Sequence, residues 1–153
     1  MGGILGCDPR WVDAILEWRW TWRAARLALV SAYLVGGLDK LSDMPGAIAE
    51  QARFGLHPAW LWASLAIVVE LGGALLVLAG RLVWLGAGAL GVLTAVAIFV
   101  ANDFWRTEGP ARFVAINGFF EHIGLIAGLA MVAMLAARRD GARAAARFAE
   151  GLQ

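Results

Sequence analysis

The chain has 153 residues, of which 61% are hydrophobic and 16% are charged, and its net charge is +1. Soluble domains usually carry about 25% charged residues, and a short chain buries the smallest share of its surface, so an ordinary soluble enzyme is excluded. The near-neutral charge excludes broad attraction to nucleic acid, and the single cysteine, Cys7, excludes an internal disulfide or a thiolate metal site. We therefore expect an all-α integral membrane protein.

The N-terminal segment, residues 1–22, is predicted to form an interfacial amphipathic helix. Asp8 and Pro9 are residue types that favour the start of a helix. Trp11 and Ile15 then fall on one face of that helix. A helix with such an apolar face lies in the membrane surface.

Four apolar stretches are long enough to cross a bilayer as helices, which takes about 20 residues each. They cover residues 20–41, 59–79, 82–101 and 113–137. Together they predict a four-helix transmembrane bundle over residues 20–137.

The connections between these spans contain helix starts and stops. Asp43 predicts the start of a short helix in the outer loop that runs to Phe54, and Gly55 ends it. The second span ends at residue 79 and the third begins at residue 82, so Gly80 is predicted to lie in a tight turn between them. After the fourth span, residues 138–153 are predicted to form a basic, alanine-rich helical tail suited to contact with anionic lipid headgroups.

The basic residues predict the orientation, because they favour the cytoplasmic side of a membrane. Nine of the thirteen lie near the N-terminus, in the turn after the second span or in the tail, and four lie in the other connections. We therefore expect both termini in the cytoplasm and the short loop helix on the outer side.

Polar side chains gather at one depth within the spans, in the outer half of the bilayer. A rise of ~1.5 Å per residue places Glu70 and Glu121 about 12–16 Å below the outer ends of their spans. The predicted polar layer draws on all four spans and consists of Glu70, Glu121, His122, Lys40, Tyr33, Asn117 and Thr94. Ionisable groups at such depth usually face the bundle interior, so we expect these side chains to converge.

The residue types of this layer leave three interpretations open. The first is a buried polar network that fixes helix pairing. The second is a site that handles protons or binds the head group of a quinone-like molecule. The third is a metal site of Glu70, Glu121 and His122, but no second histidine lies at that depth, so no metal is predicted. No covalently bound cofactor is expected.

A second patch follows the third span and consists of Asp103, Trp105 and Arg106. Tryptophan prefers the headgroup level of a bilayer, and the two charges can form a local ion pair. We expect this patch to anchor the chain at the outer interface or to form a docking edge over the polar layer.

Several segments, taken in order, resemble the DoxX family of small bacterial membrane proteins. They read GGLDKL at 36–41, FGLHP at 54–58, ELGGALLVLAG at 70–80 and FFEHIG at 119–124, and the resemblance covers residues 23–136. It implies a four-helix bundle in the bacterial inner membrane. Members of the family are linked to sulfur oxidation with quinone as acceptor and to membrane complexes that handle oxidative or thiol stress.

The resemblance therefore implies a subunit of a redox or stress-response assembly. We expect a non-catalytic or partner-dependent oxidoreductase subunit, embedded in the bilayer and bound to a larger membrane or periplasmic complex, with a quinone-like molecule as the ligand. One alternative is a structural accessory subunit beside a larger complex. Another is a small-molecule or proton transporter that acts as an oligomer.

Overall fold

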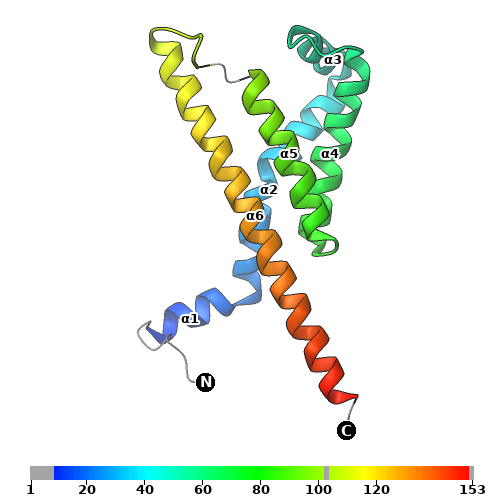
Figure 1. Cartoon of the computed structure of the whole chain (residues 1–153), viewed down its shortest axis with the longest axis vertical. Helices are drawn as coiled ribbons and strands as arrows, with labels where there is room; N and C mark the ends of the chain where they lie inside the picture. Colours follow the sequence, from blue (N-terminus) through cyan, green and yellow to red (C-terminus); the bar gives the residue numbers. More distant parts are fainter. Residues whose placement is uncertain (1–8, 102–103, 152–153) are drawn as a thin grey trace.

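The computed structural model describes residues 9–101 and 104–151 and folds them into six helices with no strand (Figure 1). The helices are α1 (Arg10–Glu17), α2 (Arg19–Ser42), α3 (Met44–Arg53), α4 (Ala59–Ala79), α5 (Val83–Ala101) and α6 (Pro110–Glu150). The expected all-α class is confirmed. Three helices of the described chain are long and apolar enough to cross a membrane, namely α4, α5 over Val83–Val100, and α6.

The helix α2 is not among these three candidate spans, although it is 24 residues long and covers the first expected span, 20–41. Its charged residues explain the difference, because Arg23 and Arg26 lie near its start and Lys40 near its end. The helix nevertheless packs along α4 and touches α6 where the two cross. It is therefore a full member of the bundle.

The predicted N-terminal helix of residues 1–22 does not run unbroken to residue 22. The helix α1 ends at Glu17, Trp18 has an extended backbone, and α2 begins at Arg19. The carbonyl of Trp18 already accepts the first hydrogen bond of α2, from the N–H of Thr21. The chain therefore changes direction at Trp18, and α1 projects from the bundle as a separate arm (Figure 1). Asp8, predicted to start this helix, lies outside the described residues.

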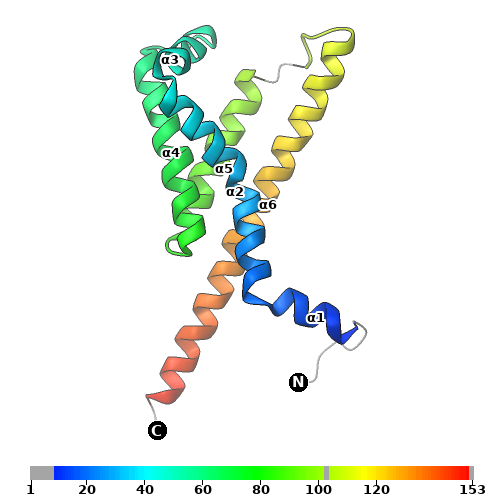
Figure 2. The same cartoon turned by 180° about the vertical axis from the view of Figure 1, so that it is seen from behind.

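The loop helix α3 begins as predicted. The carboxylate of Asp43 accepts a hydrogen bond of 3.0 Å from the N–H of Gly46, which satisfies one of the free donors at the helix start. The helix packs against α4 and closes one end of the bundle, called here the α3 end (Figure 2).

The helices α4 and α5 form the expected antiparallel hairpin. Gly80 ends α4 in the left-handed conformation, with φ of 70°, and its N–H donates to the carbonyl of Leu76. The two helices approach closely at Gly73 and Gly86, since a Cβ built at Gly86 would lie 2.7 Å from the carbonyl oxygen of Gly73. Small residues allow such close approach between membrane helices. The hairpin turn marks the other end of the bundle, called here the turn end.

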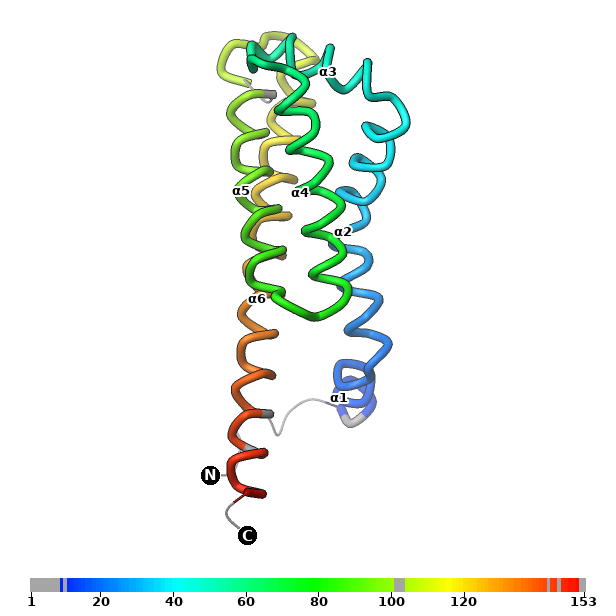
Figure 3. The backbone as a smooth tube through the Cα atoms, turned by 90° about the vertical axis from the view of Figure 1, so that its right-hand side faces the viewer, coloured from blue at the N-terminus to red at the C-terminus, as the bar shows by residue number. Residues whose placement is uncertain are grey.

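The helix α6 is one continuous element of 41 residues, which runs through the predicted fourth span, 113–137, and into the predicted tail as far as Glu150. Alanine and arginine are strong helix formers, and the junction between span and tail carries no proline. The helix packs mainly against α5, crosses α2, and extends far beyond the turn end (Figures 1 and 3).

The core draws on α2, α4, α5 and α6. Its buried side chains are Val30, Tyr33, Ala74, Val77, Val83, Ala87, Leu90, Leu129, Val132 and Ala136. The core thus fixes the relative positions of the helices that carry the polar side chains described next.

Candidate functional site

An ion pair joins α2 to α4 near the α3 end. The ammonium nitrogen of Lys40 lies 3.0 Å from Oε1 and 3.2 Å from Oε2 of Glu70, so it donates to both carboxylate oxygens. The side chains are 21% and 12% exposed, respectively. Glu70 lies in the middle of an apolar helix, where an isolated charge would be costly, and Lys40 supplies the compensating charge.

Two glycines on α2 lie against α4 beside this pair. A Cβ built at Gly36 would lie 3.5 Å from both Oε2 of Glu70 and Nζ of Lys40. At Gly37 it would lie 2.8 Å from the side chain of Leu71, so any larger residue would force that side chain or α2 itself to move. The GGLDKL segment thus places Lys40 one helical turn beyond the point of closest approach.

A second polar contact crosses the core from α2 to α5. The hydroxyl groups of Tyr33 and Thr94 lie 2.6 Å apart, and the hydroxyl of Thr94 also donates to the carbonyl of Leu90 at 2.8 Å. Tyr33 is 8% exposed and Thr94 is 3% exposed. Since the Thr94 proton goes to Leu90, the Tyr33 hydroxyl is the donor between the two.

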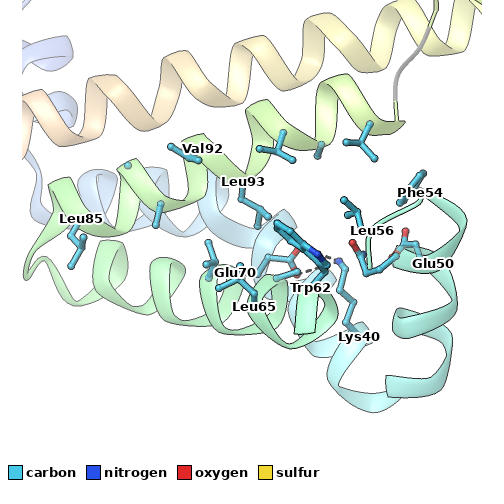
Figure 4. A pocket seen from close by; sticks show the side chains of 18 of the residues that line it. Lys40, Glu50, Phe54, Leu56, Trp62, Leu65, Glu70, Leu85, Val92 and Leu93 are labelled. Atoms are coloured by element: carbon cyan, nitrogen blue, oxygen red, sulfur yellow. Dashed lines mark hydrogen bonds and ion pairs between the residues drawn. The ribbon is translucent and has the colours of Figure 1, made fainter. Parts of the chain in front are cut away.

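A cavity of about 670 Å³ extends along α4 and α5 from the α3 end, and the ion pair forms part of its wall. Its lining is almost entirely apolar beyond Lys40, Glu70, Glu50 and Gln51 (Figure 4). The apolar lining residues are Phe54, Leu56, Trp62, Leu65, Ala66, Val69, Trp84, Leu85, Gly88, Ala89, Val92, Leu93, Val96, Ala97 and Val100. In Figure 4 the labelled polar residues lie toward α3, whereas Leu85 lies near the hairpin turn.

The predicted convergence of polar residues from all four spans is not found. Lys40 pairs with Glu70 between α2 and α4, and Tyr33 pairs with Thr94 between α2 and α5, but no polar residue of α6 takes part in either pair. The reason is the path of α6, whose first half diverges from α2 and α4 toward the α3 end (Figures 1 and 2). The tilt of α6 away from the other helices was not predicted.

The polar residues of α6 have separate environments. Asn117 and Glu121 are exposed and line a shallow hollow formed by α6 residues alone. The ring nitrogen Nδ1 of His122 bonds to the carbonyl of Gly118, one turn earlier in the same helix. In the described chain no three His, Cys, Asp or Glu side chains gather where a metal ion would fit.

The predicted outer patch is described only in part. Asp103 lies outside the described residues, and Arg106 is exposed. Trp105 packs edge-to-face on Phe104, at a ring separation of 5.2 Å, and Phe104 packs in the same way on Phe119. The aromatic rings thus attach the loop before α6 to the first turns of that helix.

Two features escaped prediction. Glu50 and Gln51 of α3 line the cavity beside the ion pair. The sequence could have indicated this, because the loop helix was predicted to end close to the start of the second span. At the turn end, the guanidinium groups of Arg26 and Arg139 lie 4.6 and 4.1 Å from the ring of Trp22. The four-residue spacing of Trp22 and Arg26 could have predicted one of these two contacts, because residues four apart are neighbours on a helix surface.

The DoxX family model matches residues 21–103, which is more than half of the chain. The match contains all but the first two residues of α2 and the whole of α3, α4 and α5, and therefore both the ion pair and the cavity. The resemblance noted at residues 119–124 lies beyond it. No curated protein and no solved structure is significantly similar to the chain. The family match and the long apolar helices identify a multi-pass membrane protein.

Proposed function

Because the chain belongs to the DoxX family, we propose that it is a membrane subunit of a redox or stress-response assembly that holds a quinone-like amphiphile in the cavity along α4 and α5. The observation that carries this proposal is the position of the Lys40–Glu70 pair at the polar end of a long apolar cavity. A quinone-like molecule is arranged in the same way, with polar oxygens on its ring and an apolar tail.

The size of the cavity supports this class of ligand. Pockets for small organic molecules usually measure about 300–1,000 Å³ and combine apolar walls with a few placed polar groups. The cavity of about 670 Å³ lies within that range, and its polar groups are confined to the α3 end. The remaining length, along Leu85, Val92 and Val96, would hold the tail.

The polar residues would have different roles toward a bound ring. The ammonium group of Lys40 has three N–H donors. Two of them bond to the carboxylate oxygens of Glu70, so one remains for a ring oxygen. The carboxyl group of Glu70 would accept or return a proton at that oxygen. Such a ligand supplies two-electron, two-proton chemistry, with the electrons exchanged by a partner protein of the assembly.

The placement in the membrane is part of the same proposal. We place α2 across the bilayer beside α4, because the two helices pack along each other and α2 has the length of a span. With the cytoplasmic termini that the basic residues favour, the ion pair lies toward the outer face of the bacterial inner membrane.

A binding titration tests the proposal without relying on the ion pair. A Cβ at Gly88 meets no atom within 4 Å, and Gly88 lines the cavity, so Gly88→Leu fills the cavity without a clash at its Cβ. A Cβ at Gly91 on the same helix is equally free but is not part of the lining. Both variants and the unmodified protein are placed in lipid nanodiscs and titrated with a short-tailed ubiquinone analogue.

We expect Gly88→Leu to weaken binding at least about tenfold, equivalent to 1.4 kcal/mol, while Gly91→Leu binds like the unmodified protein. Equal affinity in all three would overturn the proposal. The Lys40–Glu70 pair would then serve helix pairing alone, which corresponds to a structural accessory subunit.

A further inference from the structure

The first half of α6 carries polar groups that the bundle does not use. Asn117 and Glu121 are exposed, and neither makes a hydrogen bond or ion pair within the part of the chain that the structure describes. They lie seven and eleven residues from the start of α6, or ~10 and ~16 Å along it. In a membrane-spanning helix such groups face protein rather than lipid, since lipid offers them no partner.

Asn117 belongs to a continuous seam on α6. The seam consists of Asn117, Phe120, Gly124, Ala127, Met131 and Met134, spaced alternately by three and four residues, and every one of them is exposed. The large members are more than half exposed, with Phe120 at 66%, Met131 at 55% and Met134 at 57%. A spacing of three and four is the pattern of helices that pair along their length.

The opposite face of α6 already has its neighbours. Leu129, Val132 and Ala136 are buried in the core. Leu129 and Ala136 each follow a seam residue by two positions, about 200° around the helix. The helix therefore packs on the bundle with one face and leaves the other unpartnered. The seam from Asn117 to Met134 is ~26 Å long, close to the ~30 Å thickness of the hydrocarbon core.

We propose that the seam on α6 pairs with the same seam of a second copy of this chain, with the two α6 helices parallel around a twofold axis. Two features of the seam favour an identical partner. An asparagine amide is both donor and acceptor, so two copies of Asn117 satisfy each other across the axis. A single asparagine at such a position also fixes the register of paired helices.

The centre and the edge of the seam fit the same arrangement. Gly124 and Ala127 are small, so two helices can approach closely at the middle of the seam. Glu121 follows Phe120 at the edge of the seam. Around a twofold axis the two copies of Glu121 lie on opposite edges of the pair, which keeps the like charges apart.

Cysteine cross-linking in native membranes tests this proposal. In a Cys7→Ser background, single cysteines are placed at Phe120, Gly124, Ala127 and Met131, and at Leu75 as an exposed control position on α4. After oxidation, we expect disulfide-linked dimers at the seam positions and little at Leu75. Cross-links that are absent at the seam, as strong at Leu75, or formed only to another protein would overturn the proposal.

A second measurement separates pairing from folding. A Cβ built at Gly124, or at Gly72 on α4, meets no atom within 4 Å. A leucine at either position therefore causes no clash at its Cβ within the bundle. We expect Gly124→Leu to raise the dimer dissociation constant in detergent at least about tenfold, and Gly72→Leu to leave it unchanged. Equal dissociation constants in the two variants would contradict pairing through this face.

Discussion

The ammonium nitrogen of Lys40 lies within hydrogen-bond distance of both carboxylate oxygens of Glu70, at 3.0 and 3.2 Å. This one contact links two helices, compensates a charge in the middle of an apolar helix, and forms the polar end of the cavity. Unfolding measurements test its contribution to stability, and ligand titrations test its role in binding.

The first prediction concerns the energetic role of this pair. Removing one partner leaves the other charge unpaired in a largely apolar site, which costs about 3–5 kcal/mol, whereas removing both leaves no charge. We expect Lys40→Met and Glu70→Gln each to lower the free energy of unfolding by that amount, and the double variant to be more stable than either. Unfolding in mixed detergent micelles measures all four proteins, and additive losses would contradict the prediction.

The second prediction concerns the buried hydroxyl pair of Tyr33 and Thr94. Tyr33→Phe removes the bond to Thr94 but leaves Thr94 bonded to the carbonyl of Leu90. We expect a loss of about 0.5–1.5 kcal/mol in unfolding free energy. Adding Thr94→Val to Tyr33→Phe should cost less than Thr94→Val alone, and equal costs in both backgrounds would show that the two hydroxyls are not coupled.

The third prediction concerns the close contact between α4 and α5. A methyl group at Gly86 would lie 2.7 Å from the backbone oxygen of Gly73, which cannot move aside as a flexible side chain does. We expect Gly86→Ala to destabilise the protein by about 1–3 kcal/mol. The matched control is Gly91→Ala, whose added methyl meets nothing, and it should be neutral or slightly stabilising because alanine favours helices.

The fourth prediction concerns the stack at the turn end. Trp22 contacts the guanidinium groups of Arg26 and of Arg139, and the second of these contacts joins α2 to the last third of α6. Each such contact is worth about 0.5–2 kcal/mol. Trp22→Leu should therefore speed tryptic cleavage after Arg139 in detergent.

The control for this stack is Trp20→Leu. Trp20 contacts only Arg19 and Arg23, both within its own helix, among the cation–ring contacts of the described residues. It should leave cleavage of α6 unchanged, and equal acceleration by the two variants would show that the contact between α2 and α6 is unimportant.

Much of this fold could be predicted because its signals are local. Apolar runs, the Asp43 cap and the Gly80 stop predicted α3, α4 and α5 to within a residue or two of their ends. The change of direction at Trp18 had no glycine or proline to indicate it. The tail was predicted to be helical, but its unbroken continuity with the fourth span was not, because a change from apolar to basic residues alters the surroundings of a helix without ending it.

The candidate site was predicted in part, for a related reason. Depth and helical phase were enough to bring Lys40 toward Glu70 and to place Tyr33 and Thr94 in the same layer. They were not enough to exclude Glu121, because its distance from Glu70 depends on the angle between α6 and α4. That angle results from packing over the whole length of the helices and has no local signal.

The proposal that a quinone-like ligand lies with its ring beside the Lys40–Glu70 pair is tested most directly by photolabelling. A quinone analogue with a photoreactive group on its ring is bound to the protein in nanodiscs, irradiated, and mapped by mass spectrometry of the peptides. The account predicts labelling at the α3 end of the cavity, at Leu56, Trp62 or Val69, and protection by excess unlabelled analogue. Labelling at the hairpin end, at Trp84 or Leu85, or labelling that excess analogue does not reduce, would contradict it.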